Sequence, residues 1–156
     1  MFKFNVIPSL ISSILDGSLA IKGPGLIIIE ASGVVPEGRI TPQCGGIWKD
    51  SQIEGLKRVV DTIKSQGSVP GIQIGHAGRK ASMSPPFKGD YLEDESSNGW
   101  PKDVFGPSAI PFAEHYPQPN VMTKEDIKRT VQAFADAAVR ADKAGIELLE
   151  IHGAHG

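Results

Sequence analysis

The run Gly25-Leu26-Ile27-Ile28-Ile29, closed by Glu30-Ala31, decides the fold class of this chain. A strand of a parallel sheet is buried on both faces, so it reads as a continuous apolar run instead of an alternation. The run therefore predicts such a strand. Upstream, a helix is expected over residues 9–21, with three apolar side chains facing inward and a Gly-Pro-Gly stop at residues 23–25: Leu10, Ile14 and Ile21.

Downstream of this strand, residues 33–46 contain many glycines and prolines, which predicts a loop without regular structure. Asp50 can then cap a helix over residues 51–66, which Gly67 stops. Five apolar residues recur along this segment at helical spacing and predict its buried face: Ile53, Leu56, Val59, Val60 and Ile63. These segments form one strand-loop-helix unit.

The same order repeats in the rest of the chain. Residues 69–75 predict a second strand, Thr123 opens a long helix that Gly145 stops, and residues 147–152 predict a third strand. The inner face of the helix is expected at Val131, Phe134, Ala138 and Ala141, and a solvated face at Lys128, Arg129, Asp136 and Lys143. Alternating strands and helices indicate a parallel α/β sheet, either part of a barrel or doubly wound.

A long segment rich in proline and glycine, residues 76–122, separates the second strand from its helix. Connections of this length usually have a functional reason. In a barrel it would lie at the carboxyl ends of the strands, where active sites are built. We expect it to form a lid or a substrate wall, and a purely structural excursion is the alternative.

Polar residues on the second and third strands are expected to share one face of the sheet. Successive strand residues point to opposite faces. Gln73, Glu150 and His152 therefore line one cavity if their apolar neighbours face the helices, namely Ile72, Ile74, Leu149 and Ile151. An amide both donates and accepts, so Gln73 suits the edge of a heterocycle, although backbone groups could equally satisfy a core glutamine. A buried Glu150 would need a cationic partner, which could be purely structural.

Two histidines, His152 and His155, follow the third strand. As paired donors they could bind a carbonyl oxygen and stabilise the negative charge that develops there. As metal ligands they would need a further donor such as His76 or His115, and the zincin pattern is absent, so we expect no metal. A structural role without chemistry is the third reading.

Composition narrows the function classes. The chain has 156 residues, 40% of them hydrophobic and 22% charged, with a formal net charge of -2. This balance gives no broad basic field, so we expect a small-molecule substrate and no nucleic acid. The single cysteine, Cys44, suits a reducing compartment and predicts a cytoplasmic location. No segment is apolar enough to span a membrane. Residues 1–15 faintly resemble a signal peptide, but polar residues interrupt their apolar run. The sequence contains neither a dinucleotide-binding fingerprint nor a Walker motif.

Several separated motifs together resemble the Old Yellow Enzyme family of NADH:flavin oxidoreductases, in the branch of bacterial YqjM-type ene-reductases and their fungal relatives. The resemblance covers residue 18, approximately, to the end. The motifs occur in the family's order: Gly23-Pro24-Gly25-Leu26-Ile27-Ile28-Ile29-Glu30-Ala31, Pro36-Glu37-Gly38-Arg39-Ile40, Gly46-Ile47-Trp48, Gly71-Ile72-Gln73-Ile74-Gly75-His76-Ala77-Gly78-Arg79-Lys80, Gly106-Pro107-Ser108-Ala109-Ile110-Pro111-Phe112 and Glu150-Ile151-His152-Gly153-Ala154-His155-Gly156.

The resemblance implies a (β/α)8 TIM barrel that carries FMN at the carboxyl ends of its strands, with this chain supplying about strands two to four and their helices. By position, Ala31 would lie against the flavin and Gln73 would bind its pyrimidine edge. His152 and His155 would hydrogen-bond the carbonyl oxygen of an activated alkene, an enone or enal, that is reduced with NAD(P)H as electron donor through FMN.

Parts of the family pattern have no match within residues 1–156. The proton-donating tyrosine would come two residues after His155, and the first strand and the later strands are also unmatched. We therefore expect an incomplete, truncated barrel domain with weak FMN binding or none. The alternative is a non-catalytic barrel fragment that self-associates through exposed sheet edges or complements a partner half.

Overall fold

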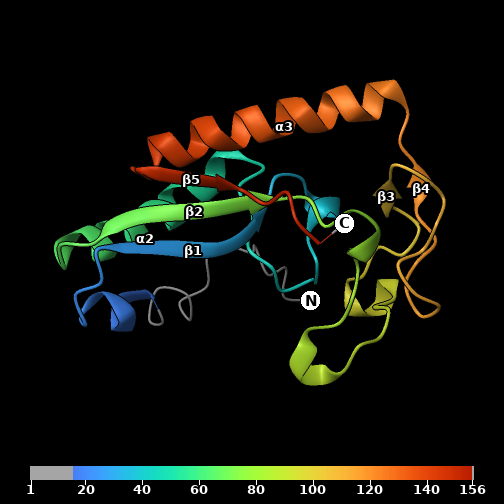
Figure 1. Cartoon of the computed structure of the whole chain (residues 1–156), viewed down its shortest axis with the longest axis horizontal. Coiled ribbons are helices and arrows are strands. Elements are labelled where there is room, and N and C mark those ends of the chain that lie inside the picture. The colour runs from blue at the N-terminus through green and yellow to red at the C-terminus, as the bar shows by residue number, and fades with distance from the viewer. Residues whose placement is uncertain (1–15, 156) are drawn as a thin grey trace.

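Three parallel strands form the main sheet: β1 (Leu26–Gly33), β2 (Val69–Gly75) and β5 (Leu148–Ile151), in the order β1-β2-β5. The computed structural model describes residues 16–155. All three predicted strands are present, and β2 has the predicted bounds. The parallel sheet confirms the predicted fold class (Figure 1).

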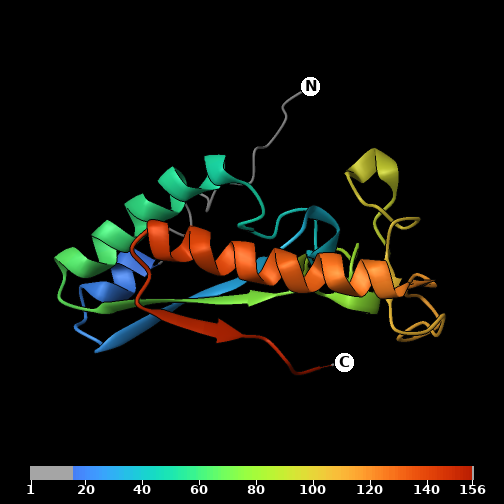
Figure 2. The same ribbon diagram turned by 90° about the horizontal axis from the view of Figure 1, so that it is seen from above.

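Two helices cover one face of this sheet: α2 (Ile53–Ser65), which follows β1, and α3 (Lys124–Lys143), which follows β2 (Figure 2). Gly67, at φ +82°, ends α2, and the predicted apolar face of that helix is buried except for the half-buried Ile53. Thr123 caps α3 by accepting a hydrogen bond from the Asp126 amide, while the Asp126 carboxylate accepts the Thr123 amide in return. Both helices therefore begin or end on local signals that the sequence contains.

The core lies between the helices and the covered face of the sheet. It is made of β-branched strand residues against aliphatic residues of α2 and alanines of α3. Its strand and helix members include Ile27, Ile29, Ile72, Ile74, Leu56, Val59, Val60, Ile63, Ala137 and Ala141. Small residues on α3 let that helix approach the sheet closely, and each buried aliphatic side chain contributes about 1.5–3 kcal/mol of hydrophobic free energy.

The opposite face of the sheet is open. Leu26 and Ile28 are exposed there, although they alternate along β1 with the core residues Ile27 and Ile29. Leu148 of β5 is exposed on the same face. In a side view no described helix covers this face (Figure 2). In a closed barrel this face would point into the interior.

Three predictions about side chains of the helices and their ends are wrong. Asp50 does not cap α2, because it starts a 3-10 turn (Asp50–Gln52) and its carboxylate accepts a hydrogen bond from Arg140 Nε at 2.7 Å. Val131 is 65% exposed, since Ala137 and Ala141 take the inner face of α3. Ile21 is 74% exposed because it lies in the turn after the helical residues 16–20, and the other predicted residues of that helix, 9–15, lie outside the described residues.

The two connections that follow strands contain more short structure than predicted. The loop after β1 has a 3-10 turn, η1 (Pro36–Gly38), and a bridge between Gly33 and Gly46. Residues 76–122 contain the turns η3 (Gly78–Lys80), η4 (Pro86–Lys88) and η5 (Glu95–Ser97), and a parallel pair, β3 (Phe105–Gly106) with β4 (Asn120–Val121). They extend past the carboxyl end of β2 (Figure 1). Among the described helices, none combines the length and apolar character needed to cross a bilayer.

Candidate functional site

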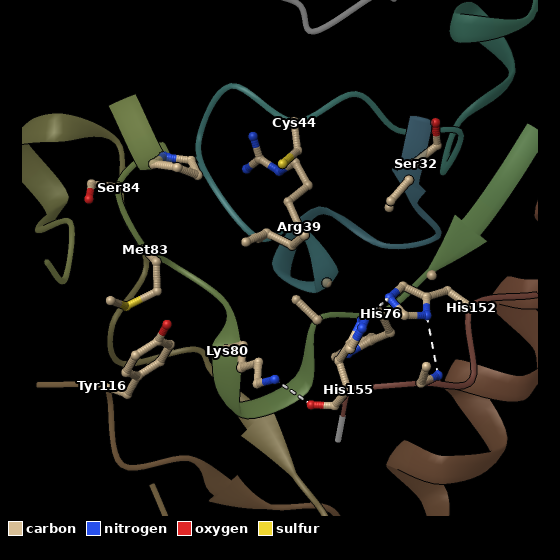
Figure 3. Close-up of a pocket in the computed structure, with 18 of the residues that line it drawn as sticks. Ser32, Arg39, Cys44, His76, Lys80, Met83, Ser84, Tyr116, His152 and His155 are labelled. Atoms are coloured by element: carbon tan, nitrogen blue, oxygen red, sulfur yellow. Dashed lines mark hydrogen bonds between the residues drawn. The ribbon is translucent and has the colours of Figure 1, made fainter. Parts of the chain in front are cut away.

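A pocket of about 550 Å³ lies at the carboxyl ends of the three strands. Its floor comes from the strand ends and its walls from the loop after β1 and the long segment after β2 (Figure 3). This volume is in the range of small-molecule sites. The lining residues used below are Ala31, Gly33, Arg39, Ile40, Gly75, His76, Lys80, Met83, Pro86, Asp90, Tyr116, His152, Ala154 and His155.

The predicted histidine pair meets in this pocket. His152 Nε2 lies 3.2 Å from His155 Nδ1, and the two rings are nearly perpendicular, at 87°. His155 has a left-handed backbone at φ +66°, and its carbonyl oxygen accepts a hydrogen bond from Lys80 Nζ. The backbone turn after β5 thus brings both imidazoles to one spot.

The hydrogen bonds of the pair define where its protons lie. Ala154 N–H donates to His152 Nδ1 at 3.2 Å, so a neutral His152 carries its proton on Nε2. That proton points to His155 Nδ1, which leaves the His155 proton on Nε2. In this arrangement the pair offers one outward N–H, and a carbonyl ligand that accepts from both rings must break the bond between them.

His76, at the end of β2, is a third imidazole in the pocket lining. Its Nδ1 accepts a hydrogen bond from the Gly78 amide at 3.0 Å. Burial lowers the pKa of His76 below its usual value, with Glu37 opposing and Arg129 adding to the shift. His76 is therefore neutral at physiological pH and has an Nε2–H.

Gln73 lies on the open face of the sheet, next to Glu150 of the neighbouring strand. The two residues are register partners, and Gln73 Nε2 donates to Glu150 Oε2 at 3.2 Å. Gln73 and His152 share this face, as predicted, but Gln73 is not among the residues that line the pocket itself. The expectation of a buried Glu150 with a cationic partner is wrong, because this residue is exposed and its carboxylate accepts a hydrogen bond from the neutral Gln73 amide.

Small residues at the strand ends leave room for a flat group. A Cβ on Gly75 would stand 3.3 Å from His152 Cβ, so a side chain there would crowd the imidazole. The register of β1 shifts between Ile29 and Ser32, which places Ala31 in the pocket lining. Bulges of this kind often re-aim residues next to active sites. The strand ends thus present small residues, Ala31 and Gly75, to the pocket, and the Gln73 side chain lies on the same face of the sheet as His152.

The cationic residues of the lining are already engaged. Arg39 stacks on Trp48 and Trp100 at 5.4 and 4.4 Å and donates to the carbonyls of Pro36 and Pro42. Lys80 Nζ binds the His155 carbonyl and lies 4.0 Å from the Phe112 ring centroid. Both cationic side chains of the lining therefore already have partners within the protein.

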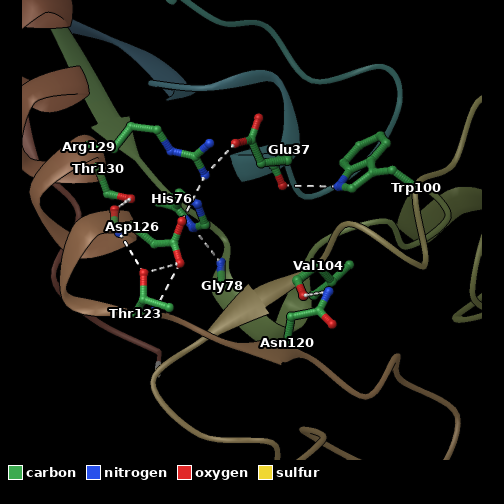
Figure 4. A network of polar contacts seen from close by, with 10 residues as sticks. All are labelled: Glu37, His76, Gly78, Trp100, Val104, Asn120, Thr123, Asp126, Arg129 and Thr130. Carbon is green, nitrogen blue, oxygen red and sulfur yellow. Dashed lines mark hydrogen bonds and ion pairs between the residues drawn. The ribbon is translucent and has the colours of Figure 1, made fainter.

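An ion-pair network fastens the walls to α3 (Figure 4). Arg129 Nη2 lies 3.5 Å from Glu37 Oε1 and 3.7 Å from Asp126 Oδ1, and the Glu37 carbonyl accepts from Trp100 Nε1 at 3.0 Å. Arg129 lies on the predicted solvated face, with its side chain 58% exposed. It also connects α3 to the loop after β1, which carries part of the pocket wall.

Several wall residues are not predicted from the sequence, among them Asp90 and Tyr116. These two lie in the long segment after β2, where no periodicity predicts which side chains turn inward. The position of the segment after a strand was the available signal. In the part of the chain that the structure describes, no three His, Cys, Asp or Glu side chains gather as a metal site.

Comparisons with known proteins identify the family of this chain. The NADH:flavin oxidoreductase / NADH oxidase family matches residues 18–156. The chain is 47% identical over 137 residues to an NADPH dehydrogenase of Geobacillus thermodenitrificans, covering 88% of this chain and 35% of that protein. It is 46% identical over 142 residues to an NADH:flavin oxidoreductase of Gibberella zeae, covering 90% and 34%.

A solved structure, TcOYE with pHBA, superposes with a TM-score of 0.77 at 27% identity, covering 99% of this chain and 45% of that one. The chain thus spans about a third of the length of the relatives above and has the fold of part of their TIM barrel. Whether its strands are the second to fourth stays a prediction. The chain belongs to the NADH:flavin oxidoreductase / NADH oxidase family, of Old Yellow Enzyme type.

Proposed function

We propose that this chain contributes to an FMN-dependent oxidoreductase that reduces the C=C bond of α,β-unsaturated carbonyl compounds, with NAD(P)H as electron donor. The observation that carries the proposal is the His152–His155 pair, whose rings meet in a pocket at the carboxyl ends of parallel strands. The names of the relatives, an NADPH dehydrogenase and an NADH:flavin oxidoreductase, support the redox class and the nicotinamide donor.

Three residues would hold the flavin. Ala31 would lie against the ring, Gln73 would pair with its pyrimidine edge, and His152 would border it from β5. When bound there, FMN would supply the hydride for the alkene. The chain's own share is to place the substrate carbonyl, which needs N–H donors aimed at its oxygen.

His155 Nε2–H is the outward donor of the pair, and His152 Nε2–H becomes a second donor once its bond to His155 Nδ1 opens. Both would stabilise the negative charge that grows on the carbonyl oxygen as the β-carbon is reduced. Before a ligand binds, the hydrogen bond between His152 and His155 takes the place of the bond to the carbonyl oxygen and holds both imidazole rings in position.

The proposal is tested by titrating the chain with cyclohexenone while the imidazole resonances are followed by NMR. We expect shifts at His152 and His155, and loss of about fivefold or more in affinity in His155→Ala, because a hydrogen bond to the carbonyl is removed. Gln132→Ala, which removes an exposed polar side chain of α3 outside the pocket lining, is the control and should bind normally. Equal affinity in both variants would contradict the assigned role.

A second proposal concerns the edge of the sheet at β5. Ile151 is 64% exposed on this strand, and Ile127, Val131 and Val139 are exposed on α3 beside it. Unpaired strand edges with apolar neighbours recruit further strands. Because the chain spans about a third of its relatives, we infer that a complementary barrel part occupies this edge, and that a second copy of the chain can substitute for it only weakly.

Adding the remaining two thirds of the Geobacillus relative in trans tests this inference. A complex on analytical ultracentrifugation, with improved flavin binding, is expected, and Ile151→Lys should weaken it. Lys substitution of the exposed Tyr91, which lies in the long segment after β2, is the control. A stable homodimer without affinity for the added part would favour self-association instead.

A further inference from the structure

The pocket has a second polar end, formed by the long segment after β2. Asp90 and Tyr116 line it there, whereas His152 and His155 line it from β5. Tyr116 stands on the side of the pocket away from His152, with Lys80 drawn between them (Figure 3). The cavity thus has polar groups at two separate places.

Hydrogen bonds hold the Asp90 carboxylate in place. Tyr116 Oη donates to Asp90 Oδ1 at 3.3 Å, and His115 Nε2 lies 2.8 Å from Asp90 Oδ2. The rings of Tyr116, His115 and Phe112 pack together, with centroids 4.8 and 5.0 Å apart. Burial, followed by the nearby Asp90 charge, raises the pKa of Tyr116, so it stays a neutral phenol. Each carboxylate oxygen keeps a further lone pair for a ligand.

Asp90 is the one acidic residue among the described lining residues. The two cationic lining residues do not neutralise it, because Arg39 is stacked between two indoles and Lys80 is bonded to the His155 carbonyl. The lining also contributes apolar side chains: Ala31, Ile40, Ala77, Met83, Pro86 and Ala154. A ligand that fits would have an acceptor at one end, a hydrocarbon middle and a donor at the other end.

We propose that Asp90 and Tyr116 form a distal anchor that selects unsaturated carbonyl compounds with an ammonium or other hydrogen-bond donor at the end remote from the carbonyl. The inference rests on the proposed function, because it names the substrate class of the same pocket. A carboxylate recognises a cation through charge and hydrogen bonding together, and Tyr116 both orients that carboxylate and offers its own oxygen as an acceptor.

Three probes test the anchor with the whole chain by calorimetric titration. The first is benzylideneacetone with a para-dimethylaminomethyl group, and the second has the isosteric para-isobutyl group, so the two differ in the ammonium alone. The third is N,N-dimethylbenzylamine, which has the ammonium but no carbonyl. Because the Asp90 side chain is 63% exposed, a moderate preference of about fivefold for the first probe over the second is expected.

Asp90→Asn should abolish that preference, and Tyr116→Phe should reduce it about twofold, since the carboxylate stays but loses one of its partners. Asp142→Asn on the surface of α3 makes the same change in net charge outside the pocket and should keep the preference. Unchanged preference in Asp90→Asn, or equal binding of the two ketones to the unsubstituted chain, would overturn the anchor. The enone proposal would survive that result.

The third probe separates the two proposals. If the amine binds and shifts the Tyr116 ring resonances while neither ketone perturbs the histidines, the anchor stands and the carbonyl site fails. If the isobutyl ketone shifts the histidines while the amine leaves Tyr116 unperturbed, the anchor fails and the carbonyl site stands. Absence of binding by all three probes would overturn both.

Discussion

The two faces of one sheet differ more than any two elements of this protein. On the covered face Ile29 is 2% exposed, whereas its neighbour Ile28, on the open face, is 41% exposed. The covered face packs on α2 and α3, and the open face carries Gln73 and Glu150 and leads to the histidine pair. Because strand side chains alternate, one strand serves both purposes, and stability and chemistry can be changed separately.

The largest expected effect on stability comes from a substitution on the covered face. Ile29→Ala should lower the free energy of unfolding by about 3 kcal/mol, because it removes buried methyl groups and leaves a cavity beside Ile72 and the helices. The same substitution at the adjacent residue, Ile28→Ala, should cost about 1 kcal/mol or less, since that side chain is already partly in water. Urea unfolding followed by circular dichroism measures both, and equal losses would mean that the two faces contribute alike.

The sequence predicted the covered face well and the pocket walls poorly, for a physical reason. Apolar periodicity and local stop signals determine β2, α2 and α3, so Val69, Gly67 and Thr123 mark real boundaries. The same alternation placed Gln73 and His152 on one face. Strand and helix periods hold over short stretches of chain and need no knowledge of distant contacts.

The walls depend on contacts between distant residues. Arg39 lies between Trp48 and Trp100, and Asp90 meets Tyr116, through turns that follow no period. The misplaced Glu150 shows a related limit: its burial was inferred from an inward direction on the strand, but inward residues are covered only when a further element packs there. The direction of a strand side chain follows from the local sequence, whereas its burial depends on which other elements pack against it.

A smaller effect concerns a buried carboxyl group in the helical turn that precedes β1. Asp16 is 4% exposed, and burial, with a contribution from Glu30 of β1, raises its pKa to about 6. The folded state therefore holds this proton more tightly than the unfolded state, whose pKa is near 3.8. Stability from this group is greatest at low pH and is lost as pH rises from about 4 to 6, amounting to roughly 2–3 kcal/mol at most.

Asp16→Asn should remove this loss. The variant should therefore gain stability over the unsubstituted chain at pH 8 but not at pH 5, as thermal unfolding of both proteins at the two pH values would show. Asp61→Asn, at an exposed position on α2, makes the same charge change and should leave the pH dependence intact. A pH profile of Asp16→Asn that matches the unsubstituted chain between pH 4 and 7 would contradict a raised pKa at Asp16.

The smallest effect on stability is expected on the open face itself, at Gln73. Gln73→Leu removes an amide whose bond to the exposed Glu150 is worth little, so the free energy of unfolding should change by about 0.5 kcal/mol or less. If this amide pairs with a flavin, however, FMN affinity should fall about fivefold to tenfold, measured by quenching of flavin fluorescence. Glu150→Leu sharpens the test, because it frees Gln73 Nε2 from its present partner and should raise that affinity, whereas an amide uninvolved in flavin binding would respond to neither substitution. A chain whose FMN affinity is unchanged in both variants would thus separate the open face of the sheet from the flavin site, and the pocket lined by the histidines would have to bind the ring alone.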